Sequence, residues 1–66
     1  MKYLKASYPH YRVRFGSQTI PHESYAAACK AAARMSNESL KTKATVVGVA
    51  PDETAILATY KRGKRQ

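Results

Sequence analysis

The most regular pattern of apolar and polar residues in the chain covers residues 11–15. Three apolar residues alternate there with Arg12 and Arg14, which predicts a strand with one apolar and one basic face. Gly16-Ser17 follows, and a glycine at the first central position is typical of a two-residue type II′ turn. This turn pairs Phe15 with Gln18, Arg14 with Thr19, and Val13 with Ile20. The register puts Ile20 beside Val13 on the apolar face, as a half-buried hairpin requires.

An alanine-rich helix is expected after this hairpin, from about His22 to Met35. Pro21 is expected to end the second strand, because proline cannot donate a hydrogen bond to a ladder. Glu23 then falls in the first turn of the helix, where a negative charge favours the helix dipole. The stop is predicted at Ser36-Asn37. The apolar stripe expected to face the sheet consists of Tyr25, Ala28, Cys29, Ala32 and Met35.

A second hairpin is predicted in the last third of the chain. Residues 41–49 are rich in β-branched side chains, residues 50–54 contain turn-forming Pro and Asp, and residues 55–60 supply the returning strand. Residues 3–8 add a short strand or a lead-in. The sequence therefore predicts a small α+β fold of order (β)ββαββ, with an antiparallel sheet of three to five strands and one helix on one face. The predicted domain covers residues 1–60, and residues 61–66 read as a basic, flexible tail.

Length and charge narrow the function. The 66 residues allow one domain with a thin core, and the 44% hydrophobic content is too high for a disordered basic tail. No apolar run approaches the roughly 20 residues that span a bilayer, and the N-terminal residues lack the apolar stretch of a signal peptide. A single cysteine cannot form an internal disulfide. We therefore expect a cytoplasmic protein, in the host cytoplasm if it is phage-encoded, with no membrane partner.

The sequence contains no recognisable motif of a catalytic or cofactor-binding site. His10 and His22 are separated by a predicted strand, and Cys29 has no partner at the spacing of a zinc site. No nucleophile is accompanied by a base and an orienting group, and no glycine-rich phosphate loop is present. We expect a protein that is not an enzyme and has no cofactor or metal.

The basic residues are the most informative set. Twelve Lys and Arg against four Asp and Glu give a formal charge of +8, and such an excess attracts polyanions through counterion release. Tyr3, Tyr8, Tyr11 and Tyr60 interleave with these cations, and exposed aromatic rings beside cations stack single-stranded bases. The residues expected to contact nucleic acid are Arg12, Arg14, Thr19, Lys30, Arg34, Lys41, Lys43, Lys61, Arg62, Lys64 and Arg65. The alternative is a soluble basic domain whose partner is a protein.

The basic hairpin and the alanine-rich helix over residues 11–35 resemble the sheet-and-helix DNA-binding units at the N-termini of phage-type integrases. The resemblance implies a sheet that enters the major groove, with Arg12, Arg14 and Thr19 at contact positions. The second hairpin lies outside the resemblance. The chain is also similar to small phage proteins of hairpin-helix-strand order that inhibit host enzymes.

Together these observations predict a small nucleic-acid-binding accessory or regulatory protein of phage or mobile-element origin, with DNA and RNA both open as partners. The alternative is a small inhibitor or adaptor that docks on a host protein through an acidic patch or by strand addition. An open sheet edge is also suited to a homodimer.

Overall fold

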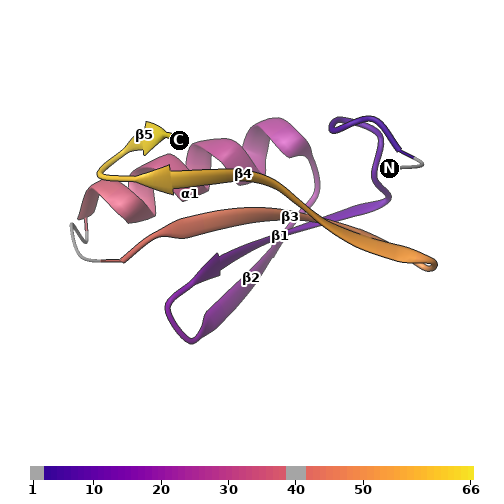
Figure 1. Ribbon diagram of the computed structural model, residues 1–66, viewed down its shortest axis with the longest axis horizontal. Helices are drawn as coiled ribbons and strands as arrows, with labels where there is room; N and C mark the ends of the chain where they lie inside the picture. Colours follow the sequence, from indigo (N-terminus) through magenta and orange to yellow (C-terminus); the bar gives the residue numbers. More distant parts are fainter. Residues whose placement is uncertain (1–2, 39–41) are drawn as a thin grey trace.

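The computed structural model describes residues 3–38 and 42–66. In these ranges the chain forms an antiparallel sheet of five strands with one helix across one face, in the order ββαβββ (Figure 1). The predicted α+β class is confirmed, and the fifth strand lies at the C-terminal end, not the N-terminal end. The elements are β1 (His10–Phe15), β2 (Gln18–His22), α1 (Tyr25–Glu38), β3 (Ala44–Ala50), β4 (Glu53–Lys61) and β5 (Lys64–Arg65).

The first hairpin has the predicted register. Phe15 pairs with Gln18, Arg14 with Thr19 and Val13 with Ile20. Gly16 has a φ of +61°, whereas Ser17 has a negative φ, so the turn is of type II′. In the sheet order β2-β1-β3-β4-β5, β1 pairs with β3 on its other side.

The predicted end of β2 at Pro21 was wrong. Pro21 pairs with Arg12, and His22 continues the strand. Hydrogen-bonded and non-hydrogen-bonded pairs alternate along an antiparallel hairpin, and counting from the turn puts Pro21 at a non-hydrogen-bonded position. Because β2 is an edge strand, its missing N–H faces outward and breaks no ladder bond.

The helix accordingly starts and ends later than the sequence predicted. Ser24 caps it, since the Ser24 Oγ accepts a hydrogen bond from the Ala27 N–H at 3.1 Å. Glu23 therefore precedes the helix. The helix also runs past the predicted stop, to Glu38. Ser36 is fully buried within it and donates to the Ala33 carbonyl at 3.1 Å.

The core lies between α1 and one face of the sheet. Val13 and Val46 are fully buried on the two central strands, and Ala28 and Ala32 are fully buried on the helix. These alanines are one turn apart, and their small side chains let the helix lie close to the strands. Ser36 continues the same line, a position that the predicted stripe missed. Cys29, Tyr25 and Met35 are only partly buried at the margin of this contact.

The second hairpin is tighter than predicted. Ala50 pairs with Glu53 across the two-residue turn Pro51-Asp52, so β4 begins earlier than residue 55. The β3–β4 register shifts between Val46 and Val47, whose partners are Ala58 and Ile56. Leu57 is thus the extra residue of a β-bulge, and it is buried together with Ala58. The bulge leaves Ile56 pointing to the opposite face, where it is 68% exposed. The part of the predicted strand at Lys41 lies outside the described residues.

The N-terminal segment forms no strand over residues 3–9 of the structure, but it is held by tyrosines. The Tyr8 ring lies over Gly48, where an added Cβ would be 2.6 Å from the ring. The Tyr8 hydroxyl donates to Glu53 Oε2 at 2.6 Å. The Tyr11 hydroxyl accepts from the Tyr8 N–H at 3.0 Å and donates to the Lys5 carbonyl at 2.9 Å. This segment therefore closes the core beside the start of α1 (Figure 1).

The hydrogen bond between Tyr8 and Glu53 predicts a specific alkaline destabilisation. The Glu53 carboxylate, followed by burial, raises the pKa of Tyr8 from 10.0 to about 12. A raised pKa in the folded state contributes stability that is complete below pH 10 and is lost as the pH rises toward 12. We expect Tyr8→Phe to remove this component, so that the thermal midpoint of the variant falls less steeply than that of the wild type between pH 10 and 12. Parallel pH curves for the two proteins would contradict the assignment.

Candidate nucleic-acid interface

The sheet face opposite α1 is covered by no other element in the described part of the chain (Figure 1). Strand alternation and the cross-strand register assign the residues of this surface, which we call the open face. The open face consists of His10, Arg12, Arg14, Thr19, Pro21, Thr45, Val47, Val49, Thr54, Ile56, Thr59, Lys61 and Lys64.

The open face carries positive charge without negative charge. Arg12, Arg14, Lys61 and Lys64 are exposed on it, and exposed Lys43 directly precedes β3 at the same end. All four carboxylates of the chain lie elsewhere. Glu23 precedes α1, Glu38 ends it, Asp52 lies in the β3–β4 turn, and Glu53 bonds Tyr8 on the helix side. The face therefore presents positive side chains, with no Asp or Glu side chain among them, to an approaching polyanion.

Arg14, Lys43, Lys61 and Lys64 lie toward one end of the open face, and Arg12 lies in its middle, beside a small apolar end. Val47 has Arg12 and Ile56 as its cross-strand neighbours. It is only 2% exposed although it lies outside the core cluster, which indicates that these longer side chains cover it. Val49 lies beside this group on β3. The open face thus offers a basic end and a small apolar end that includes exposed Ile56.

The last six residues form a hairpin where the sequence predicted a solvated tail. Lys61 pairs with Lys64, and Tyr60 pairs with Arg65. The two turn residues both have positive φ, 55° at Arg62 and 79° at Gly63, as a type I′ turn requires. The Gly63 N–H donates to Ser36 Oγ at 3.0 Å, which fixes the hairpin to the end of α1. This strand was not predicted because residues 61–66 contain no apolar side chain and because arginine is unusual at the positive φ that the turn requires.

This hairpin brings like charges together. Lys61 and Lys64 lie directly opposite each other on the open face, an arrangement that costs stability unless an anion approaches. With Arg62 and Gln66 they line a shallow hollow. Three ammonium and guanidinium groups and one amide around a hollow are suited to a phosphate group.

The contact between Ser36 and Gly63 gives a stability prediction. Ser36→Ala removes the acceptor of the Gly63 N–H, and we expect a loss of about 1 kcal/mol in the free energy of unfolding. Hydrogen exchange at residues 61–65 should accelerate, because the hairpin loses its attachment to α1. Ser17→Ala, at an exposed turn position, serves as the control and should change stability by less than about 0.5 kcal/mol. Unchanged exchange in the Ser36 variant would show that other contacts hold the hairpin.

The structure brings together only part of the predicted contact set. Arg12, Arg14, Thr19, Lys43, Lys61 and Lys64 lie on or beside the open face, with Arg62 at the hairpin tip. Lys30 and Arg34 are exposed on the helix, on the other side of the molecule. Arg65 lies on the helix side of the sheet. Burial and Cys29 raise the pKa of Tyr25 and of Tyr60, and the charge of Arg65 opposes part of this rise. Lys41 lies outside the described residues.

The tyrosines do not form the exposed stacking surface that the sequence suggested. Tyr8 and Tyr11 are buried, at 5% and 2% exposure. Tyr3 packs on Tyr8 with a ring-centroid distance of 5.0 Å, and Tyr60 is opposite Ala44 on the helix side of the sheet. Tyr11 and Tyr60 alternate with cations along β1 and β4, whereas Tyr3 and Tyr8 lie in the N-terminal segment, which forms no strand.

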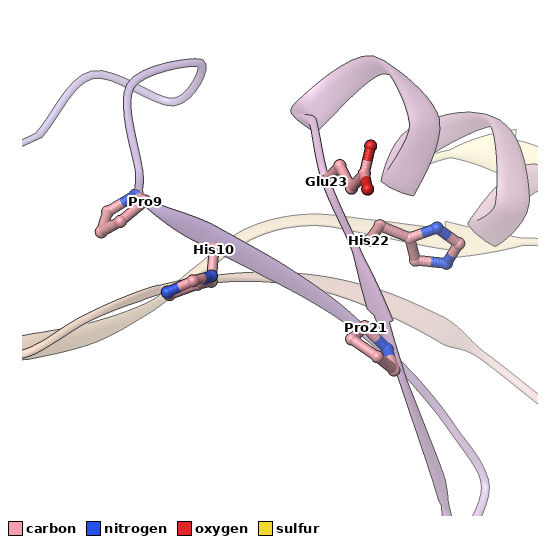
Figure 2. Close-up of a pocket in the computed structure, with 5 residues that line it drawn as sticks. All are labelled: Pro9, His10, Pro21, His22 and Glu23. Carbon is pink, nitrogen blue, oxygen red and sulfur yellow. The ribbon is translucent and has the colours of Figure 1, made fainter.

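A second hollow lies where β1 begins and β2 ends (Figure 2). Pro9, His10, Pro21, His22 and Glu23 line it. Figure 2 shows the two imidazole rings pointing away from each other, so they do not form a joint site. Over residues 3–38 and 42–66, no group of three His, Cys, Asp or Glu side chains is placed to hold a metal ion.

Comparison with known proteins gives no match to a family model, to a curated protein or to a solved structure. The described helix is too short and too polar to cross a membrane.

Proposed function

We propose that this protein is a non-enzymatic nucleic-acid-binding module that contacts the phosphate backbone with its open face. The observation that supports the proposal is the charge distribution. Arg12, Arg14, Lys61 and Lys64 share a face with no carboxylate, and Lys43 extends the same end. Salt-sensitive binding to phosphates is the interaction that such a surface provides.

The roles of the contact residues follow from their chemistry. Arginine presents a planar group that binds a phosphate through two parallel hydrogen bonds, so Arg12 and Arg14 are expected to fix the orientation of the backbone. Lysine acts as a flexible point charge, so the Lys61–Lys64 pair contributes affinity with little geometric preference. Thr19, opposite Arg14 on exposed β2, supplies a neutral hydroxyl donor at the border. An accessory or regulatory role in a phage or mobile element is part of this proposal.

A second candidate function is supported by a different observation. Ile56 is exposed, and β4 pairs with β5 only at Tyr60 and Lys61. Counting from the Pro51-Asp52 turn, the backbone groups of Thr54 and Ile56 point to the outer side of β4. This edge and the apolar end of the open face suit strand addition by a partner protein, or by a second copy of this chain.

A pull-down with the tagged protein from a bacterial lysate, with and without nuclease treatment, separates the two candidates. The proposed function predicts that nucleic acid co-purifies and that the associated proteins disappear after nuclease treatment. Ile56→Lys is the diagnostic variant, because it retains the basic end and places a charge in the apolar end. A single protein that survives nuclease treatment and is lost with Ile56→Lys would establish the second candidate and contradict the first.

A further inference from the structure

We infer that the nucleic acid bound by the open face is double-stranded. The inference rests on the proposed function and adds the class of ligand. Its basis is the distribution of aromatic side chains, which is independent of the distribution of charge.

No tyrosine or phenylalanine ring of the chain lies on the open face; the His10 imidazole lies there, beside Val49 and away from Lys61 and Lys64. The chain has five tyrosines, one phenylalanine and no tryptophan, and all six rings are in the described residues. Tyr11 and Phe15 alternate with the arginines of β1 and face the helix. The remaining rings pack at the N-terminal segment, on α1 or under β4; they are Tyr3, Tyr8, Tyr25 and Tyr60.

Single-stranded nucleic acid loses its main source of affinity on such a surface. Proteins that bind single strands stack successive bases on aromatic side chains, and this stacking supplies much of their affinity. The open face offers β-branched side chains instead, on Thr45, Ile56 and Thr59. These side chains are stiff at χ1 and form a preorganised, non-stacking surface. An ordered duplex already has its bases stacked and needs only its phosphates bound.

Electrostatics favours the same ligand. The logarithm of affinity falls with the logarithm of salt by about 0.9 per phosphate contact on duplex DNA and by about 0.7 on single strands. With one contact each from Arg12, Arg14, Lys43, Lys61 and Lys64, the expected slopes are about −4.5 and about −3.5. The difference of about 0.2 per contact over five contacts is about 1.0 in slope, so from equal affinities at about 1 M salt the duplex becomes about tenfold tighter than the single strand at about 0.1 M.

Fluorescence anisotropy with labelled oligonucleotides tests the inference directly. One mixed-sequence strand without self-complementarity is compared with its duplex, in DNA and in RNA form, between about 50 and about 200 mM salt. We expect about tenfold tighter binding to at least one of the duplexes at about 0.1 M salt, with the steeper slope. Equal or tighter binding to the single strand would overturn the inference and leave the proposed function intact. No salt-dependent binding to any of the four probes would contradict the proposed function itself.

Intrinsic tyrosine fluorescence provides a second readout, because the chain lacks tryptophan. A base that stacks on a tyrosine quenches its emission. Titration with the duplex should leave the emission unchanged within the error of dilution. Strong quenching that saturates at the binding stoichiometry would show that a ring takes part, and would overturn the account of the open face as a non-stacking surface.

Discussion

Arg12→Ala/Arg14→Ala should bind nucleic acid about 60-fold more weakly than the wild type at about 0.1 M salt. Each arginine that neutralises one phosphate contributes about 0.9 to the slope of log affinity against log salt, so the slope should become less steep by about 1.8. Both side chains are exposed, so the loss of stability should be limited to the cover that Arg12 gives to Val47. Anisotropy titrations at several salt concentrations measure the affinity and the slope together.

Lys30→Ala/Arg34→Ala is the matched control, because it removes the same charge from the exposed side of α1. At about 0.1 M salt the Debye length is about 10 Å, comparable to the thickness of one layer of the fold. We expect its affinity to stay within about threefold of the wild type. Equal losses in the two variants would mean that net charge alone drives binding, and that the open face is not the contact surface.

Gly48→Ala should be the most destabilising small substitution in the sheet. The added Cβ would lie 2.6 Å from the Tyr8 ring, so the ring must leave its position and break its hydrogen bond with Glu53. Overpacking of this kind costs about 3 kcal/mol, which corresponds to a thermal midpoint about 15 °C lower in a domain of this size. Thermal and denaturant unfolding measure the loss.

A double-mutant cycle identifies the cause of that loss. Tyr8→Ala removes the ring, and in this background Gly48→Ala should cost less than about 1 kcal/mol, because nothing opposes the added methyl group. An undiminished cost in the Tyr8→Ala background would attribute the effect to the β3 backbone. The contact between Tyr8 and the sheet would then have no part in it.

Local patterns predicted the first hairpin and the helix because the strand faces, the turn and the helical stripe are all specified by residues close together in the sequence. Alternation with Gly16-Ser17 specified both the strand faces and the register. The predicted start of the helix at His22 is wrong because proline is compatible with the outer side of an edge strand, so Pro21 does not end β2. Ser24, directly before the alanine run, is a typical N-cap residue, and the prediction of a helix from His22 did not use it.

Long-range packing explains what the sequence could not supply. Gly48 receives the Tyr8 ring from 40 positions away, and no local pattern encodes that contact. The bulge at Leu57 interrupts strand alternation, so that Leu57 and Ala58 both face the core while Ile56 lies on the open face. Residues 61–66 lack apolar side chains, so their hairpin depends on β4 and Ser36. Because such contacts are long-range, the sequence identifies the basic residues but does not show which of them lie on the open face and which on the helix side.

The two isoleucines of the chain provide the most direct test that the open face is the binding surface. Ile56 is 68% exposed on the open face, whereas Ile20 pairs with Val13 on the helix side of the sheet. In a sample with labelled isoleucine δ1 methyl groups, NMR titration with duplex nucleic acid monitors each face by one signal. The account predicts a saturable shift of the Ile56 signal and an unchanged Ile20 signal. A shift of Ile20 with Ile56 unaffected would place the nucleic acid on the other side of the sheet and contradict the account.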